Sequence, residues 1–148
     1  MLVTDIMTTD VFAVAPDTSL ETAARLLTTK HITGAPVVTN GKPIGVVTLS
    51  DLVNPDRLAS AHHGYPLFYR IGGDESDTVG DFALDGEGVV SDVMSPFVLA
   101  IDSSAAVEEA GARLVSEEVH RLLVIDRQKL VGIVSSLDVI RGMLRRGP

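Results

Sequence analysis

The sequence predicts an α/β (α+β) fold made of two copies of one small unit, each running strand, helix, strand, strand, helix. Three observations carry this prediction: an internal repeat, the hydrophobic pattern inside each copy, and a hairpin signal between two apolar runs. The repeat is clearest in GVVTLSD, residues 45–51, and GIVSSLD, residues 132–138, which lie 87 positions apart.

The same offset aligns identical residues along both copies without a gap. The aligned pairs include Val3 with Val90, Asp5 with Asp92, Met7 with Met94, Glu21 with Glu108, Leu27 with Leu114 and Lys42 with Lys129. A unit of about 50 residues buries too little surface to be stable alone, so the copies are expected to pack on each other. We expect a first unit at 1–53, an acidic connector or insertion at 54–88, and a second unit with a C-terminal helix at 89–148.

In the first copy, Val11–Val14 is an apolar run typical of a short strand, and Pro16-Asp17 is a turn signal. Thr18 or Ser19 can cap a helix that runs to about Lys30. Its apolar residues recur at helical spacing and predict a buried stripe of Leu20, Ala23, Ala24 and Leu27.

Two further strands are predicted at APVV, residues 35–38, and IGVVTL, residues 44–49, around Asn40-Gly41. Asn-Gly is a strong signal for a two-residue hairpin turn, and the second copy has Arg127-Gln128 there. The runs SDLV, residues 50–53, and LDVIRGMLRR, residues 137–146, predict the closing helices.

Composition excludes several functions. The chain of 148 residues carries a net charge of −8 and no cysteine. The charge argues against nucleic acid as a main partner, and the missing cysteines exclude disulfides, thiolate catalysis and cysteine zinc sites. Without a signal peptide or a membrane-length apolar segment, the protein is expected to be cytoplasmic, with no membrane partner.

The connector holds seven acidic residues against two arginines. Its one apolar run, GYPLFYRI at residues 64–71, fits either an ordered connector or a surface that docks a partner. His62-His63, near Asp56, has no spacing known for metal sites, and we expect no metal. No grouping predicts catalysis, so we expect no enzyme.

The hydroxyl and carboxylate of Thr48 and Asp51, and of Ser135 and Asp138, stand three positions apart before a predicted helix. One interpretation is a capping box, in which each side chain satisfies a backbone amide. The other is a ligand site, because the N-terminus of a helix favours anions and a carboxylate can bind the hydroxyls of a sugar. The residues alone leave both interpretations open.

Five segments carry a resemblance to a known family: the openings TDIM at 4–7 and SDVMSP at 91–96, HRLLVID at 120–126, and the paired closings GVVTLSD at 45–51 and GIVSSLD at 132–138. With them the chain resembles a tandem pair of cystathionine β-synthase (CBS) domains, as in stand-alone CBS-domain proteins. The resemblance covers about residues 2–53 and 89–144. It implies two units related by a pseudo-twofold axis, with small sheets packed together and two clefts between them.

The resemblance also implies the ligand-binding residues. In nucleotide-binding members the closing Asp holds the ribose, and the partner unit covers the adenine and contacts the phosphates. For the main cleft it implies Thr48, Asp51, Phe97, Leu99, Val119, His120 and Arg121. For the second cleft it implies Ser135, Asp138, Asp10, Phe12, Ile32, Thr33 and Gly34. Arg121 suits phosphate, whereas Thr33 and Gly34 carry no charge, so we expect the main cleft to take the phosphorylated ligand. The alternative for Arg121 is a surface ion pair with Glu117 or Glu118.

The function expected is a regulatory, energy-sensing module that binds AMP, ADP or ATP, with S-adenosylmethionine and NADH as other candidates. It would form a homodimer and act on a downstream protein that the sequence does not specify. The alternative function is a structural, dimerisation or protein-interaction module with vestigial clefts.

Overall fold

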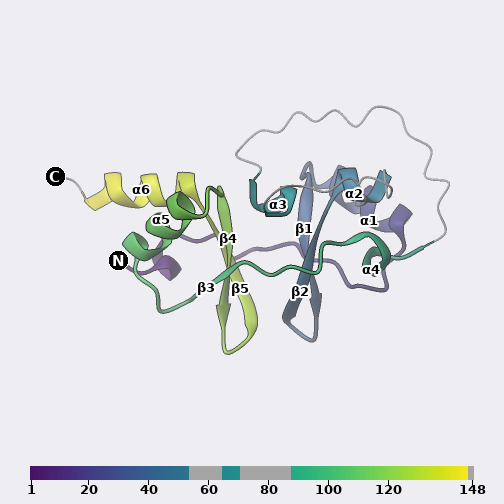
Figure 1. The fold of residues 1–148 in the computed structure, drawn as a ribbon, viewed down its shortest axis with the longest axis horizontal. Coiled ribbons are helices and arrows are strands. Elements are labelled where there is room, and N and C mark those ends of the chain that lie inside the picture. The colour runs from purple at the N-terminus through teal and green to yellow at the C-terminus, as the bar shows by residue number, and fades with distance from the viewer. Residues whose placement is uncertain (54–64, 71–87, 147–148) are drawn as a thin grey trace. The chain divides into compact units, whose positions relative to one another are not determined.

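The computed structural model describes residues 1–53, 65–70 and 88–146 (Figure 1). The chain divides into two compact units. Among the described residues, unit 1 contains 1–11, 69–70 and 99–146, and unit 2 contains 12–53, 65–68 and 88–98. Each unit therefore combines the body of one sequence copy with the opening segment of the other. The domain boundaries expected from the sequence follow the repeat. The two units of the structure follow the contacts between residues, so their boundaries differ from the expected ones.

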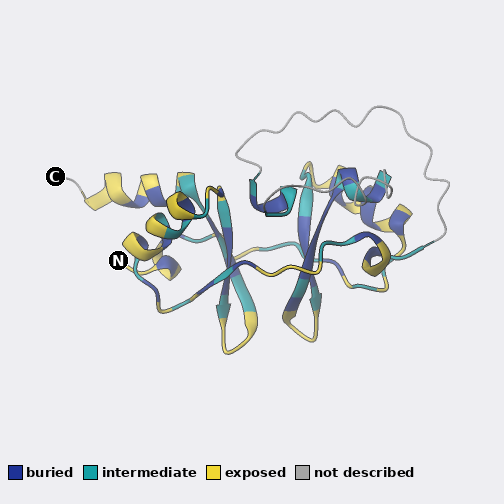
Figure 2. Ribbon diagram, viewed as in Figure 1, coloured by how far each residue is buried: buried dark blue, intermediate teal, exposed yellow. Residues whose placement is uncertain are grey.

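Unit 2 holds an antiparallel pair of strands, β1 (Gly34–Thr39) and β2 (Lys42–Thr48). Its helices are α1 (Leu20–Thr29), α2 (Leu49–Val53) and α4 (Val90–Val93). Another helix, α3 (Leu67–Arg70), begins in unit 2 and ends in unit 1. Figure 2 colours the ribbon of buried residues dark blue. In unit 2 the buried apolar residues form one core: Val14, Leu20, Ala23, Ala24, Leu27, Ala35, Val37, Val47, Leu52, Val90 and Val93.

Helix α1 is as predicted. It is capped by Ser19, whose hydroxyl accepts a hydrogen bond from the Thr22 amide at 3.1 Å. The predicted stripe of four apolar residues is the buried face of the helix. Burying that stripe, rather than helix propensity alone, stabilises a helix of this length.

The predicted hairpin is present in both copies. Asn40 and Gly41 have φ angles of 51° and 81°, the positive pair that a tight two-residue hairpin turn requires. Arg127 and Gln128 take the same conformation, with φ angles of 51° and 70°. Gly and Asn tolerate this left-handed conformation, whereas Arg and Gln are strained in it, so the second turn is held by the strands around it.

The prediction of a strand at Val11–Val14 is wrong in its length. Only Val14 pairs, in a parallel bridge with Val37. The Val14 amide donates to the Pro36 carbonyl at 3.0 Å. In the second copy the Leu123 amide donates to the Leu99 carbonyl at 3.1 Å, next to the strand that does form. Pro36 occupies the position of Leu123 and has no amide hydrogen, so the ladder of the first copy cannot extend.

Unit 1 has a three-stranded sheet in the order β3-β4-β5. Strand β3 (Ala100–Asp102) is parallel to β4 (Arg121–Asp126), which is antiparallel to β5 (Lys129–Ser135). Helices α5 (Val107–Ser116) and α6 (Ser136–Arg146) pack on each other in this unit, and Val3–Asp5 forms a 3₁₀ turn.

Backbone hydrogen bonds attach each opening segment to the strand of the other copy. In unit 2 the amides of Val46 and Ser95 each donate to the other residue's carbonyl at 2.9 Å. In unit 1 Thr8 and Ile133 exchange the same pair of bonds, at 2.9 and 3.0 Å. Glycine precedes both strand residues. A Cβ atom at Gly45 would lie 2.5 Å from the Ser95 carbonyl oxygen, and one at Gly132 would lie 2.8 Å from that of Thr8.

Replacing Gly45 by alanine is therefore expected to destabilise the protein, because the new methyl group meets a backbone atom that cannot rotate away. We expect Gly45→Ala to lower the free energy of unfolding by about 2 kcal/mol, measured by urea denaturation. The matched control is Gly111→Ala in α5, where the Cβ atom would lie at an ordinary 3.4 Å from a Val139 methyl group. This control should raise stability by about 0.5–1 kcal/mol. Equal effects of the two substitutions would contradict the close-approach argument.

Candidate functional site

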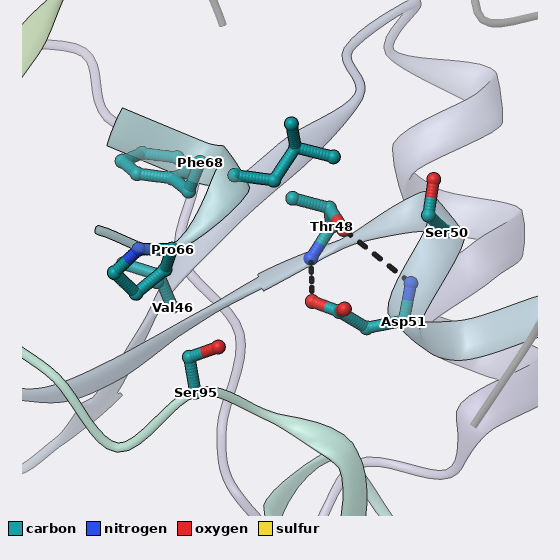
Figure 3. A pocket seen from close by; sticks show the side chains of 8 residues that line it. Val46, Thr48, Ser50, Asp51, Pro66, Phe68 and Ser95 are labelled. Carbon is teal, nitrogen blue, oxygen red and sulfur yellow. Dashed lines mark hydrogen bonds between the residues drawn. The ribbon is translucent and has the colours of Figure 1, made fainter. Parts of the chain in front are cut away.

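The strand-to-helix turn at the end of β2 holds Thr48 and Asp51 in a reciprocal pair of hydrogen bonds (Figure 3). The Thr48 amide donates to Asp51 Oδ2 at 2.9 Å, and the Asp51 amide donates to Thr48 Oγ1 at 3.3 Å. The Leu49 amide donates to the Thr33 carbonyl at 2.7 Å, which ties the turn to the residue before β1. The carboxylate is therefore fixed by backbone atoms on a rigid part of the fold.

The second copy repeats this geometry. The Ser135 amide donates to Asp138 Oδ2 at 2.9 Å, and the Asp138 amide donates to Ser135 Oγ at 3.1 Å. The Ser136 amide donates to the His120 carbonyl at 2.9 Å. The capping interpretation is thus confirmed in both copies. It leaves the ligand interpretation open, because a capping carboxylate has more than one lone pair to offer.

A small pocket in unit 2 opens beside the Thr48–Asp51 turn (Figure 3). The space in it is about 10 Å³, enough for about one water molecule. The lining residues come from β2, α2, the connector and the opening segment of the second copy: Val46, Thr48, Ser50, Asp51, Pro66, Leu67, Phe68 and Ser95. The connector residues of this pocket were not predicted as site residues. The signal for them was the apolar run in an otherwise acidic connector.

Phe97, predicted for the main cleft, and four residues predicted for the second cleft also lie in unit 2. Phe97 is 42% exposed, and its ring contacts that of Tyr65 at 5.4 Å between centroids. Phe12 lies under the Lys30 ammonium group, 5.0 Å from its ring centre. Ile32, Thr33 and Gly34 are half-buried around the start of β1.

The remaining predicted residues lie in unit 1. Arg121 is half-buried and pairs directly with Ser135 across strands β4 and β5. Leu99 and Val119 are buried, whereas His120 and Asp10 are exposed. Of the two acidic side chains considered as ion-pair partners of Arg121, Glu117 pairs with Arg113 at 3.1 Å.

Tyr69 is a buried polar residue of the connector. It has no exposed surface, and its hydroxyl accepts a hydrogen bond from the Leu99 amide at 2.9 Å. Its backbone carbonyl accepts another from the His120 amide at 2.8 Å. Burial raises the pKa of the phenol from 10.0 to about 12, although the Leu99 hydrogen bond acts in the opposite direction.

Within residues 1–53, 65–70 and 88–146, no three His, Asp or Glu side chains gather as a metal site would require. No helix in this part of the chain is long and apolar enough to cross a membrane. The His62-His63 pair and Asp56 lie outside the described residues.

Comparison with protein families identifies the repeated unit. The CBS domain model matches residues 3–55 and 90–145, so the chain belongs to the CBS domain family and carries the domain twice. This agrees with the mixed α/β fold and its two small sheets.

Two curated relatives and one solved structure resemble the chain over most of its length. The CBS domain-containing protein CBSX2, chloroplastic, of Arabidopsis thaliana is 30% identical over 145 residues, which cover 89% of this chain but 58% of the relative. The CBS domain-containing protein YhcV of Bacillus subtilis is 28% identical over 137 residues, covering 93% of this chain and 81% of the relative. The crystal structure of CBSX2 in complex with AMP is 31% identical, with a TM-score of 0.68, and covers 99% of this chain and 98% of that one.

Neither relative is named for a catalytic activity. The expected cytoplasmic location stays a prediction, since CBSX2 is named as a chloroplast protein.

The buried phenol makes stability sensitive to high pH. The folded-state pKa of Tyr69 lies above the unfolded value, so its contribution is complete below pH 10.0 and is lost as the pH rises toward about 12. Between these limits we expect the wild-type protein to lose about 2 kcal/mol more unfolding free energy than Tyr69→Phe, measured by urea denaturation at each pH. Parallel pH profiles for the two proteins would contradict the burial of an un-ionised phenol.

Proposed function

We propose that this CBS-domain pair is a regulatory module that binds an adenine nucleotide at the turn formed by Thr48 and Asp51. The observation that carries the proposal is the carboxylate of Asp51, held by the Thr48 amide at the end of β2. Support comes from CBSX2, whose structure was solved in complex with AMP and matches this chain over nearly its whole length. In the proposed complex, Asp51 accepts hydrogen bonds from the ribose hydroxyls.

The remaining roles follow the two copies of the repeat. Arg121 and His120 would contact the phosphate, because a guanidinium group offers several donors and a permanent charge. Phe97, Leu99 and Val119 would cover the base. At the positions equivalent to His120 and Arg121 the first copy has Thr33 and Gly34, so the site of Ser135 and Asp138 would be empty or take a less anionic ligand. AMP, ADP and ATP share the adenine and ribose on which the proposal rests.

The proposed role is regulatory because the ligand would act through shape and assembly. A ligand that prefers one arrangement of the protein shifts the population toward it. The proposal therefore expects bound nucleotide to be recovered unchanged, with an effect transmitted to a protein partner.

The direct test of the site is AMP binding to Asp51→Asn, measured by isothermal titration calorimetry. The amide keeps an oxygen that can cap the turn, but it lacks the charge that strengthens hydrogen bonds to the ribose. We expect AMP affinity to fall about 10- to 100-fold, the range that losing a charged hydrogen bond produces.

The matched control for this test is Asp92→Asn. Asp92 Oδ2 accepts from the Val89 amide at 2.9 Å, the same distance as in the Thr48–Asp51 turn, but Asp92 does not line the pocket. Its substitution should leave AMP affinity unchanged. No binding of AMP, ADP or ATP to the wild-type protein would overturn the proposed function and leave the interaction module as the alternative.

A homodimer is the second part of the proposal, and it rests on an apolar patch on α5 and α6 of unit 1. We define the α5–α6 patch as Val115, Leu137, Ile140, Met143 and Leu144, which are between 51% and 79% exposed. Leu137, Ile140 and Leu144 share one face of α6 by their spacing. Monomeric proteins rarely leave a contiguous apolar patch uncovered, and a second copy of the chain is the partner we propose for it.

We expect Ile140→Glu to convert the dimer into a monomer, because it would bury a carboxylate in the interface without a partner. The measurement is the molar mass by size-exclusion chromatography with light scattering. Leu26→Glu, which alters an exposed apolar residue of α1 in the other unit, should leave the mass unchanged. A wild-type protein that is monomeric at high concentration would contradict the proposed dimer.

A further inference from the structure

The connector residues Tyr65–Phe68, here named the plug segment, pack on the turn that is proposed to hold the ligand. Pro66, Leu67 and Phe68 line the pocket together with Thr48 and Asp51 (Figure 3). The space in this pocket, about 10 Å³, holds about one water molecule, so it is far too small for a nucleotide. A nucleotide cannot enter this pocket while the plug segment stays in place.

Phe68 fills the space of a side chain that the first copy lacks. A Cβ atom at Gly34 would lie 3.1 Å from Phe68 Cδ1, so the ring packs directly against the backbone of this glycine. The equivalent residue in the second copy is Arg121. The absence of a side chain at position 34 thus permits Phe68, which is 1% exposed, to pack at the start of β1.

The other end of the plug segment covers a residue proposed to contact the base. The rings of Tyr65 and Phe97 are 5.4 Å apart between centroids and tilted by 57°, a favourable arrangement of two aromatic side chains. The plug segment therefore contacts both the proposed ribose-binding turn and Phe97, which is proposed to cover the base.

The second copy provides an internal comparison, because its turn has the same hydrogen bonds. Thr48 is 3% exposed and Ser50 is 8% exposed. Their equivalents are more open, since Ser135 is half-buried and Leu137 is 51% exposed. Thr48 and Ser50 are therefore more deeply covered than their equivalents, although the two turns have matching hydrogen bonds and Asp51 and Asp138 are both half-buried.

A buried polar group without a partner lies at the end of α3, the helix that includes Leu67 and Phe68. Arg70 Nε, at the end of α3, is buried and has no hydrogen-bond partner in the described part of the chain. A buried donor without a partner opposes the packed arrangement, because water would satisfy it if the helix moved away. The unpaired Arg70 Nε therefore opposes the packed position of α3, to which Leu67 and Phe68 of the plug segment belong.

We propose that the plug segment is an autoinhibitory contact, and that an adenine nucleotide binds at Thr48 and Asp51 only by displacing it. This proposal rests on the proposed function of the same site. Displacement of the plug segment would also change contacts in unit 1, because Phe68 and Tyr69 are neighbours in the single turn of α3. Tyr69 accepts hydrogen bonds from the Leu99 and His120 amides of unit 1, so withdrawal of α3 breaks contacts there.

The first test is AMP affinity in Phe68→Ala, measured by isothermal titration calorimetry. Competition by the plug segment reduces the apparent affinity by the fraction of molecules in which the site is open. Weakening the plug segment should therefore tighten AMP binding by roughly tenfold or more. The matched control is Leu27→Ala, which removes a buried side chain of α1 outside the pocket and should leave AMP affinity unchanged.

The second test needs no variant. The chain contains two tyrosines and no tryptophan, and both tyrosines, Tyr65 and Tyr69, lie in or beside the plug segment. Displacement should make tyrosine emission more accessible to acrylamide quenching as AMP is added, with a midpoint that matches calorimetry.

The outcomes separate the autoinhibitory contact from the proposed function. Tighter AMP binding to Phe68→Ala than to the wild-type protein, together with greater quenching, supports both. Equal or weaker binding to the variant, or tyrosines more protected by AMP, overturns the autoinhibitory contact and leaves the nucleotide site standing. No AMP binding to either protein overturns both.

Discussion

The close approach of two backbones at Gly45 and Gly132 is the constraint on which the rest of the structure depends. At each glycine the opening segment of the other sequence copy comes so near that a Cβ atom would lie 2.5 Å from Ser95 O or 2.8 Å from Thr8 O. Paired backbone hydrogen bonds fix the contact in each unit. Because each unit is completed by a segment of the other copy, neither half of the sequence contains a whole unit. Both copies are therefore needed to complete either unit.

The same short sequence carries the proposed chemistry at its other end. GVVTLSD begins with the glycine that admits the opening segment and finishes with the aspartate that caps the turn into α2. A carboxylate that already accepts a backbone hydrogen bond is oriented before any ligand arrives, which lowers the entropy that binding must overcome. The Asp51 side chain can therefore cap the turn and bind a ligand at once, because the capping hydrogen bond holds the carboxylate in position.

The sequence was sufficient for features that depend on local patterns. The repeat, the stripe of α1, the Asn40-Gly41 turn and the capping boxes all follow from short-range rules. The extent of the Val11–Val14 strand did not, because it depends on whether Pro36, on a neighbouring strand, can donate a hydrogen bond. The packing of Phe68 against Gly34 was equally hidden, since the two residues are far apart in the chain. Such long-range contacts decide which face of the proposed site is open.

The central claim, that an adenine nucleotide binds at the Asp51 turn, is tested most directly by the backbone amide NMR spectrum during an AMP titration. The amide of Thr48 donates to the carboxylate that is proposed to receive the ribose, and the amide of Asp51 belongs to the same turn. The account predicts that these two resonances, and those of Leu67 and Phe68, shift most and saturate together. Saturable shifts confined to other regions, with these four amides unmoved, would contradict it.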